Sequence, residues 1–289
     1  MINNPLLNPP PVILNGQKRE GVLRKYAEKN NPGNKIPEIL CITTFPPREC
    51  GIATYSQDLL SALNKKFKRS FTFSICALES ETEIHFYKEI ISHILNTDQP
   101  GSFTDLADEI NASKEIELVM IQHEFGLFDK CEKEFIEFIN SLTKPVVIVF
   151  HTVLPHPGEK LKPIVQRISG IAATVIVMTN SSANILVKDY GIPLEKIMVI
   201  PHGTHLVHHS GKEFLKEKYQ LSGKKVLSTF GLISAGKGIE TTLDALPAII
   251  EKNSDVIFLI IGKTHPSVLR QAGETYREML RHQVPALHI

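Results

Sequence analysis

The amino-acid sequence predicts an α/β protein built on a parallel, doubly wound β-sheet. Three observations support this prediction. Between residues 38 and 200, short continuous apolar runs alternate with amphipathic helical patterns, which is typical of strands covered by helices on both faces. After Pro201 the composition changes to a segment rich in Gly and His, residues 202–211, which marks a domain boundary. A second, shorter α/β pattern begins near residue 224.

Composition and periodicity divide the chain into four segments. Residues 1–35 contain Asn, Pro, Lys and Gly with little periodicity, so we expect a loose N-terminal arm. Residues 36–203 form the predicted N-terminal Rossmann-like domain, and residues 204–223 a linker with a connecting helix. Residues 224–289 contain only two predicted strands and two predicted helices, which are too few for an independent domain of this type. Either the chain is truncated, or this partial second domain packs on the first domain or on a partner.

Within the first domain, each predicted strand is a short apolar run, and each predicted helix repeats apolar residues at a spacing of three or four. Residues 39–43 are predicted to form a buried strand, 45–51 a loop with two prolines, and 52–64 a helix with a leucine-rich face. Gly191 and Pro193 end the last helix of the domain. The further strands are expected at 71–78, 116–121, 146–150, 174–178 and 197–200, and the further helices at 104–112, 132–142, 159–168 and 181–190.

A glycine loop joins the first strand and helix of the second domain. Strand 226–230 leads into the loop, and helix 239–252 follows it. The distinctive residues of the loop are Gly231, Gly236, Lys237 and Gly238. A strand, a glycine loop and a helix in this order point backbone N–H groups and the positive end of a helix dipole at an anion, and Lys237 adds a mobile charge. The loop therefore predicts a phosphate-binding site, with a purely structural turn as the alternative. The second domain continues with a predicted strand at 256–261 and a predicted helix at 267–281, and the connecting helix of the linker is predicted at 212–219.

The loop differs from the P-loop of nucleoside triphosphatases in two ways. A P-loop has Ser or Thr after its lysine to reach Mg²⁺, and this position is Gly238. The next strand ends at Gly262 without the aspartate that usually completes the metal site. A nucleoside triphosphatase is therefore disfavoured, since it would require magnesium-dependent phosphate release that Lys237→Ala abolishes.

The composition excludes several other classes of protein. The 32 basic and 31 acidic residues nearly cancel, so no bulk charge attracts nucleic acid. Cys41 and Cys76 lie in apolar strands, and the four cysteines show no paired spacing, which indicates buried free thiols in a reducing compartment. No apolar run approaches the length of a membrane span, and the polar N-terminus does not resemble a signal peptide. We therefore expect a cytoplasmic protein.

Polar residues follow three predicted strands at the edge where parallel α/β sheets bind ligands. The loop after the first strand contains Arg48 and one glycine, Gly51, so it is not the Gly-x-Gly-x-x-Gly motif of a dehydrogenase. His123 and Glu124 follow a second strand, and His151 a third. Because these strands share one direction, we expect the side chains to meet at one rim.

Histidines in two places could suggest a metal. His123 and Glu124 do not form a zinc-protease motif, because Leu127 stands at the place of its second histidine. Four more histidines lie near the domain boundary at spacings that fit no tight metal site, so we interpret them as linker residues. They are His202, His205, His208 and His209.

Five segments together resemble the retaining glycosyltransferases of family 4, whose fold is called GT-B. Each segment is weakly specific, but all five occur in the family's order between residues 38 and about 280. They are Phe45-Pro-Pro-Arg-Glu-Cys-Gly-Ile-Ala-Thr-Tyr55, Gln122-His-Glu-Phe-Gly126, Phe150-His-Thr-Val153, Val199-Ile-Pro-His-Gly203 and Phe230-Gly-Leu-Ile-Ser-Ala-Gly-Lys-Gly-Ile-Glu240.

The resemblance implies a fold and a set of roles. The fold would be GT-B-like, with a complete N-terminal Rossmann-like domain on the acceptor side and a partial second domain that grips a nucleotide-sugar. His151 looks like the family's histidine that faces the transferred sugar, and Lys237 like the lysine that neutralises the diphosphate leaving group. The donor phosphate would contact Gly51, Gly231, Gly236, Lys237 and Gly238. Arg48, His123 and Glu124 would lie on the acceptor and sugar side.

The implied reaction is the transfer of a hexosyl unit from a nucleoside diphosphate sugar to an acceptor hydroxyl with retention of configuration. Cations and a helix N-terminus would replace a divalent metal, so neither a metal nor a cofactor is expected. The partners would be the nucleotide-sugar donor and a glycan or lipid-linked acceptor, without nucleic acid. Membrane association would follow from a lipid acceptor, but the sequence shows only a modest basic cluster near the first helix.

The sequence departs from the family in two respects. Leu232 stands where the family usually has an arginine beside the lysine, with Arg270 and Lys263 as possible replacements. The family's two glutamates eight residues apart, near the donor sugar and ribose, would lie beyond Ile289. We therefore expect a fragment that is weakly active or inactive by itself. The alternative is a non-catalytic glycan-binding module derived from a glycosyltransferase.

Overall fold

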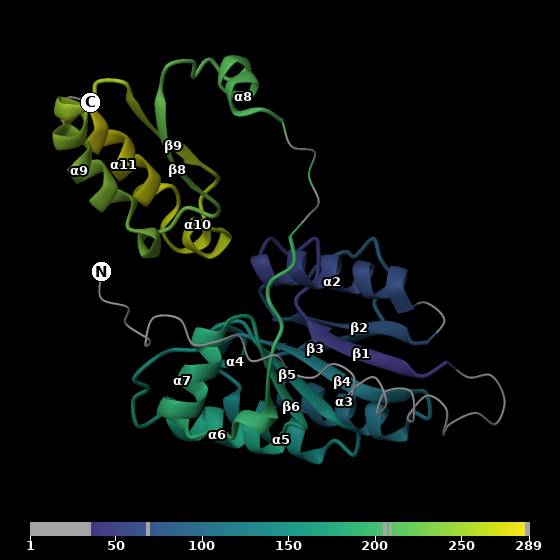
Figure 1. Cartoon of the computed structure of the whole chain (residues 1–289). Coiled ribbons are helices and arrows are strands. Elements are labelled where there is room, and N and C mark those ends of the chain that lie inside the picture. Colours follow the sequence, from purple (N-terminus) through teal and green to yellow (C-terminus); the bar gives the residue numbers. More distant parts are fainter. Residues whose placement is uncertain (1–35, 68–69, 205–206, 208–209, 287–289) are drawn as a thin grey trace, which may run out of the picture. The chain divides into compact units, whose positions relative to one another are not determined.

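The computed structural model describes residues 36–67, 70–204, 207 and 210–286 (Figure 1). The chain divides into two compact units, residues 1–203 and 204–289, which we call unit 1 and unit 2. The loose arm expected at residues 1–35 lies outside the described residues.

Unit 1 contains a sheet of seven strands in the order β3-β2-β1-β4-β5-β6-β7, and every neighbouring pair is parallel. The predicted parallel α/β sheet is therefore confirmed. Its strands are β1 (Glu38–Thr43), β2 (Thr72–Glu79), β3 (His93–Asn96), β4 (Ile116–His123), β5 (Val146–Phe150), β6 (Thr174–Val177) and β7 (Ile197–Val199).

Helices cover both faces of this sheet. On one face lies α2, and on the other lie α3, α5, α6 and α7 (Figure 1). The helices of the unit are α2 (Gly51–Phe67), α3 (Pro100–Ala112), α4 (Phe125–Phe128), α5 (Glu132–Ser141), α6 (Leu161–Ile171) and α7 (Asn180–Tyr190), with a 3₁₀ turn η1 (Leu194–Lys196). Gly191 ends α7 with φ 69°, as its position after the helix predicted.

The core of unit 1 follows from the apolar strands. Leu40, Ile42, Ile121 and Ile148 are fully buried between the sheet and the helices α3, α5, α6 and α7. On the opposite face, Leu60 of α2 packs with Cys41, Phe45, Met120 and Val149. Cys41, Cys76 and Cys131 are buried free thiols, which confirms the interpretation of the cysteines in the strands.

The sequence pattern missed one strand of the sheet. The strand β3 has four residues, of which Leu95 alone is buried, and it pairs only with β2 among the described residues. A four-residue run at the edge of a sheet has too few buried positions to produce a clear apolar pattern. The strand β4 is also two residues longer than the predicted 116–121, so that His123 is its last residue and not part of the following loop.

Unit 2 contains a parallel pair of strands, β8 (Lys225–Phe230) and β9 (Val256–Ile261). Ile233, Ile239, Leu243 and Leu280 form its buried cluster. The helices of the unit are α8 (Lys212–Lys218), α9 (Ile239–Lys252), α10 (Pro266–Ala272) and α11 (Thr275–Ala286), and the 3₁₀ turn η2 (Ala235–Lys237) precedes α9.

The single helix predicted at 267–281 is wrong. Two helices, α10 and α11, occupy this region, and Gly273 lies between them with φ 60°. Only glycine adopts this left-handed conformation readily, so the apolar periodicity continues across a break in the backbone.

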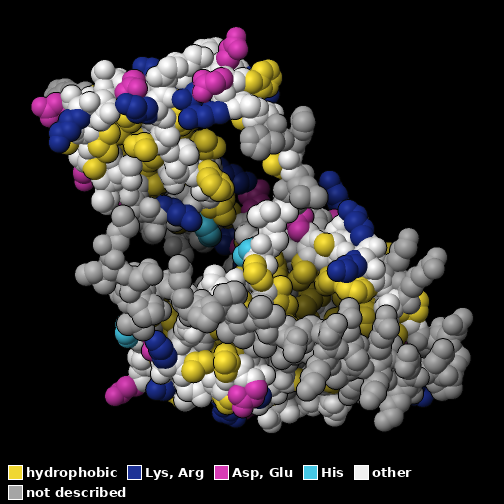
Figure 2. All heavy atoms as spheres, in the orientation of Figure 1, with side chains coloured by type: hydrophobic (Ala, Val, Ile, Leu, Met, Phe, Trp, Pro, Cys, Tyr) yellow, Lys and Arg dark blue, Asp and Glu magenta, His cyan; other side chains and the backbone are white. Residues whose placement is uncertain are grey.

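The two-stranded sheet of unit 2 has one covered face. Phe258 and Ile260 point toward α9 and α11 and pack on the buried cluster. Phe230 and Ile261 alternate with them and are 82% and 54% exposed. Figure 2 shows hydrophobic side chains gathered on the visible face of this unit. Among the described residues, no helix has both the length and the apolar character needed to cross a bilayer.

Candidate functional site

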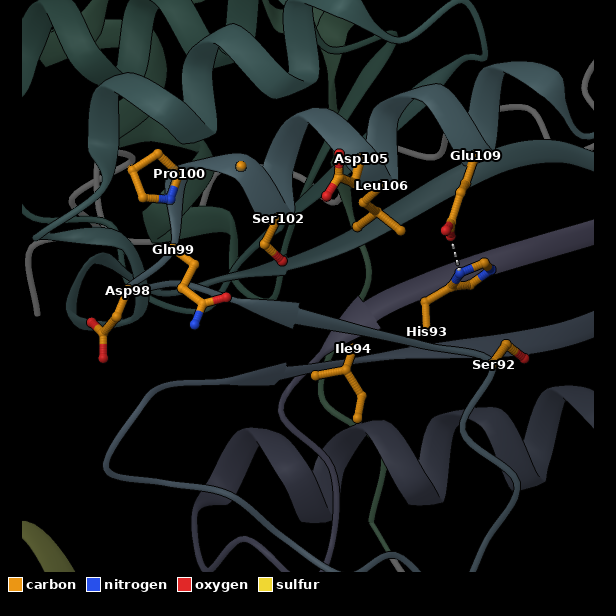
Figure 3. Close-up of a pocket in the computed structure, with 11 residues that line it drawn as sticks. Ser92, His93, Ile94, Asp98, Gln99, Pro100, Ser102, Asp105, Leu106 and Glu109 are labelled. Carbon is orange, nitrogen blue, oxygen red and sulfur yellow. Dashed lines mark hydrogen bonds and ion pairs between the residues drawn. The ribbon is translucent and has the colours of Figure 1, made fainter.

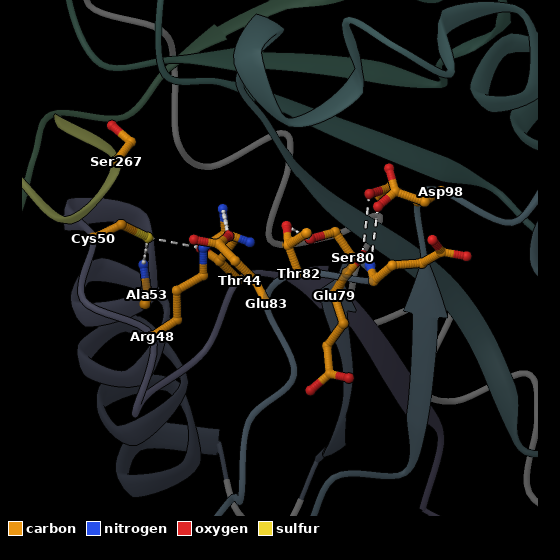
Figure 4. Close-up of polar contacts among 12 residues, drawn as sticks. Thr44, Arg48, Cys50, Ala53, Glu79, Ser80, Thr82, Glu83, Asp98 and Ser267 are labelled. Carbon is orange, nitrogen blue, oxygen red and sulfur yellow. Dashed lines mark hydrogen bonds and ion pairs between the residues drawn. The ribbon is translucent and has the colours of Figure 1, made fainter. Parts of the chain in front are cut away.

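The loop after β1 is held in place by contacts within unit 1. Thr43, the last residue of β1, lies 2.6 Å from Ser56 of α2, hydroxyl to hydroxyl. Cys50 Sγ accepts a hydrogen bond from the backbone N–H of Ala53, 3.4 Å away, in the first turn of α2. Arg48 forms a 2.6 Å ion pair with Glu83, which lies in the segment after β2 (Figure 4). The predicted acceptor-side residue Arg48 is thus already paired with a carboxylate.

Gly51 is the first residue of α2, at the end of the helix with free backbone N–H groups. Its φ is not in the left-handed region, and a Cβ added to it would meet no atom within 4 Å. The fold itself therefore does not require glycine at this position. A glycine that neither the backbone nor the packing requires leaves space beside the helix N-terminus, which fits the predicted close approach of a donor phosphate.

His151 lies directly after β5 and is half-buried. Its backbone N–H donates to the carbonyl of His123, 3.0 Å away, which extends the hydrogen bonding between β4 and β5 by one residue. Its Nε2 lies 2.8 Å from Oε1 of Gln122, a fully buried residue of β4. Its ring meets the ring of Tyr55, from α2, edge to face at 5.0 Å. Strand, neighbouring strand and helix therefore all fix the orientation of His151.

His151 is a neutral imidazole at physiological pH. Burial lowers its pKa to about 4, and His202 adds a smaller effect in the same direction. The ring of His202 lies 4.8 Å from Tyr55, on the segment that follows β7. A neutral imidazole has one donor and one acceptor nitrogen, so His151 can hydrogen-bond a hydroxyl but does not supply a positive charge.

His123 is buried among aromatic rings and does not reach the rim. It is 2% exposed, and its ring centroid lies 5.0 to 5.5 Å from those of Phe125, Phe128, Phe135 and Phe150. Burial lowers its pKa to about 3, and its Nδ1 has no hydrogen-bond partner among the described residues. The side chain predicted to contact an acceptor instead packs beneath the rim, because β4 extends through residue 123.

Glu124 reaches the rim that His123 does not. Its Oε1 accepts a hydrogen bond from the N–H of Phe125 at 3.2 Å and caps the short helix α4. Its Oε2 accepts a hydrogen bond from the hydroxyl of Thr152 at 2.6 Å. Glu124 therefore ties the segment after β4 to the segment after β5, next to His151.

The glycines in the loop after β8, and Gly262 after β9, differ in whether the backbone requires glycine at their positions. Gly231 has φ 119° and Gly262 has φ 152°, and a Cβ on Gly262 would lie 1.8 Å from the carbonyl oxygen of Gly231. These two glycines let the ends of β8 and β9 pass close to each other. Gly238 has φ 58° and forms the left-handed N-cap of α9. Gly236 is exposed and has no such restriction.

Lys237 ends the 3₁₀ turn directly before Gly238 and α9, and it is exposed. No hydrogen bond or ion pair of its ammonium group to any described residue is found. The loop thus places an available cation beside the positive end of a 14-residue helix, as a phosphate site requires. Leu232, at the place of the family's arginine, is half-buried and supplies no charge.

A hollow of about 720 Å³ lies elsewhere in unit 1, between α3 and the edge strand β3 (Figure 3). Its wall carries Asp98, Asp105 and Glu109, and Glu109 pairs with His93 at 2.9 Å. None of the predicted site residues lines it. In the part of the chain that the structure describes, no three His, Cys, Asp or Glu side chains are grouped so that they could hold a metal ion.

Unit 1 brings part of the predicted set together. Glu124 accepts a hydrogen bond from Thr152, the residue next to His151, so these two predicted residues lie near each other at the rim, while His123 is buried. Two residues that contact His151, Gln122 and Tyr55, were not among the candidate site residues, although both lie in the five segments that resemble the family. The signal for Gln122 was a polar residue at the end of an otherwise apolar strand, since such a residue is buried only when it has a partner.

Comparison with known proteins was made for the sequence and for the fold. Residues 51–207, more than half of the chain, match the family model described as Glycosyltransferase Family 4. No curated protein matches the sequence.

Several solved structures share the fold. A glycosyltransferase from Rickettsia africae ESF-5 has a TM-score of 0.58 and 17% identity over 88% of this chain and 66% of its own. An E. coli structure described as trehalose-6-phosphate bound with UDP-2-fluoro glucose has a TM-score of 0.57 and 11% identity, over 86% of this chain and 70% of its own. An α,α-trehalose-phosphate synthase (UDP-forming) from Burkholderia vietnamiensis has a TM-score of 0.54 and 12% identity, over 89% and 70%. The chain thus spans 66 to 70% of the length of these structures.

Proposed function

The chain belongs to glycosyltransferase family 4 and has a GT-B-type α/β fold, and on this basis we propose that it transfers a hexosyl unit from a nucleoside diphosphate sugar to an acceptor hydroxyl, with retention of configuration. The observation that supports this proposal most is the position of His151, inside the matched region. It is neutral, oriented by Gln122 and Tyr55, and next to Glu124 at the rim.

The proposed roles follow the chemistry of each group. The bond between the anomeric carbon and the diphosphate oxygen breaks, and a bond to the acceptor oxygen forms on the same face of the sugar. The proton of the acceptor hydroxyl passes to the leaving diphosphate. Negative charge develops on the leaving diphosphate, which Lys237 and the N-terminus of α9 would stabilise. Gly51 would give the diphosphate room at the N-terminus of α2, and His151 would hydrogen-bond the transferred sugar. Arg48 and Glu124 would lie on the acceptor side, and His123 would support the rim from below.

A sugar-transfer assay tests the proposal. The protein would be incubated with UDP-, GDP- and ADP-sugars and a panel of glycan and lipid acceptors, and products would be detected by mass spectrometry. We expect transfer with one donor. The transfer rate should fall at least about tenfold in His151→Ala, which corresponds to the loss of one hydrogen bond, and it should fall further in Lys237→Ala. Release of the sugar with inverted configuration would contradict the proposed stereochemistry.

The absence of a metal requirement is part of the proposal. Lys237 and two helix N-termini supply positive charge where other transferases use a divalent cation, so activity is expected to persist in excess EDTA. The measurement is the transfer rate before and after chelation, with added Mg²⁺ as a control. A rate that disappears with EDTA and returns with Mg²⁺ would refute a metal-free mechanism.

A glycan-binding module is the second candidate. The family match ends at residue 207, before the glycine loop, so it supports unit 1 more directly than unit 2. A binding module would bind glycans but not nucleotides. Calorimetry with UDP and GDP separates the two candidates, since micromolar affinity for either nucleotide excludes the module. Binding of a glycan with no affinity for any nucleotide would favour it.

A further inference from the structure

We propose that Gln122 is a positioning residue that sets the tautomer of His151, so that Nε2 carries the ring hydrogen and Nδ1 offers a lone pair to a sugar hydroxyl. The identity of the ligand in this inference rests on the proposed function. The tautomer itself is a property of the free protein and can be measured without any substrate.

The contact between the two side chains is short and rigidly supported. Oε1 of Gln122 lies 2.8 Å from Nε2 of His151. Gln122 is 0% exposed in β4, where it pairs in register with Val149 of β5. His151 follows β5 and is held by its own backbone hydrogen bond to His123. Backbone hydrogen bonds between β4 and β5, extended by the one from His151 to His123, thus fix the distance between the two residues that carry these side chains.

The chemistry of an amide oxygen decides which nitrogen carries the hydrogen. A carbonyl oxygen only accepts hydrogen bonds, so a ring nitrogen 2.8 Å from it must donate. His151 is neutral, because burial lowers its pKa to about 4, and therefore has a single ring hydrogen. With that hydrogen on Nε2, Nδ1 can act only as an acceptor.

The two ends of the Gln122 amide differ in their contacts. Nε2 of Gln122 is buried and has no hydrogen-bond partner among the described residues. Oε1, by contrast, lies 2.8 Å from Nε2 of His151. The contact with His151 is therefore the side-chain hydrogen bond that this buried amide makes within the described part of the chain.

An accepting nitrogen restricts the ligand group that His151 can bind. A sugar hydroxyl can donate to Nδ1, whereas a fully ionised phosphate oxygen has no hydrogen to give. His151 would therefore select the hydroxyl face of the donor sugar and leave the diphosphate to cationic groups such as Lys237. This division of roles explains how a histidine near a phosphorylated ligand can act without being charged.

The test is nitrogen-15 NMR on the full chain labelled at histidine. Long-range proton–nitrogen spectra of the wild type at pH 7 should show a protonated Nε2 and an unprotonated Nδ1 for His151, assigned from His151→Gln. In Gln122→Met, which removes the oxygen at similar size, we expect a mixture of tautomers. The control is Gln57→Met, because Gln57 bonds Glu89 on the protein surface and should leave the His151 signals unchanged.

The outcomes separate this inference from the proposed function. A wild-type His151 with the hydrogen on Nδ1 would refute the inference even if Gln122→Met failed to fold, and so would an unchanged tautomer in Gln122→Met. If the wild type transfers sugar, kcat/KM should fall about tenfold in Gln122→Met, as expected for the loss of one hydrogen bond. A correct tautomer together with no transfer of any sugar would refute the proposed function and leave the role of Gln122 standing.

Discussion

Two histidines at the carboxyl ends of β4 and β5, one buried and one half-buried, dominate the candidate site at the scale of single residues. His123 is surrounded by four phenylalanine rings, and His151 lies between Gln122 and Tyr55. Both have pKa values below the usual range, and burial is the first cause in each case. A folded protein that keeps these rings neutral binds fewer protons than its unfolded chain in mildly acidic solution.

The first prediction follows from His123. Its pKa of about 3 in the folded state lies below its usual value of 6.5, so the unfolded chain takes up the proton first as the pH falls. Stability is therefore complete above pH 6.5 and is lost on acidification toward pH 3. By linkage, His123 accounts for about 2 kcal/mol of the stability lost between pH 7 and pH 4.5. Urea unfolding at both pH values should show a loss smaller by this amount in His123→Leu, and an equal loss in both proteins would contradict the prediction.

The second prediction concerns Gly51. Because a Cβ there meets no atom within 4 Å, Gly51→Ala should change the free energy of unfolding by no more than about 0.5 kcal/mol. The added methyl group would occupy the space proposed for the donor, so nucleotide-sugar affinity should fall at least about tenfold. Denaturation and calorimetry on the same preparation measure the two effects. Gly101→Ala is the matched control, since its Cβ is equally unobstructed but lies at the start of α3.

At this scale, the sequence predicted which residues lie near the rim, but it did not predict how deeply each side chain is buried. His151 was placed correctly at a strand end, because the apolar run stops at Phe150. His123 was expected at the surface, and its burial depends on four phenylalanines from β5, α5 and the segment after β4. Phe125 and Phe128 lie close to His123 in the sequence, but the contacts with Phe135 and Phe150 join more distant residues and leave no local pattern.

Among the elements, apolar strands were the most predictable and helix breaks the least. The strands at 146–150 and 256–261 and the helix at 239–252 have the predicted bounds. The break between α10 and α11 depends on the backbone conformation of a single residue, Gly273. Since glycine occurs in helices as well as in turns, composition alone did not separate these two possibilities.

The third prediction tests the close approach of the backbone after β8 to the backbone after β9. A Cβ on Gly262 would lie 1.8 Å from the carbonyl oxygen of Gly231, and the φ of 152° is itself unfavourable for other residues. Gly262→Ala should therefore destabilise unit 2 by at least about 2 kcal/mol. Gly236→Ala, in the glycine loop after β8 and without these restrictions, serves as the control and should leave stability nearly unchanged. Similar unfolding curves for the two variants would show that the close approach of Gly262 to Gly231 does not constrain the fold.

The two units of the molecule differ in how much of their sheet is covered by helices. Unit 1 has a seven-stranded sheet with helices on both faces. In unit 2, the sheet has two strands, and Phe230 and Ile261 on its second face are largely exposed. The α/β class and the change near residue 203 could be predicted from local patterns and composition. The strand order could not, because it is set by contacts between distant segments.

The fourth prediction follows from this difference. Amides in β8 and β9 should exchange with deuterium markedly faster than those in β1 and β4, because fewer buried contacts oppose their opening. Mass spectrometry of peptides from each strand, after exchange of the full chain, measures the rates. Equal protection of both sheets would mean that unit 2 is supported by contacts beyond its own buried cluster.

The common direction of the seven strands in unit 1 also has an evolutionary consequence. Every strand ends at the same rim, so the segments that follow β1, β4 and β5 can lengthen, shorten or mutate without disturbing a ladder hydrogen bond. Substrate preference can therefore diverge between descendants by insertions at one border of the molecule, while the scaffold beneath is inherited intact.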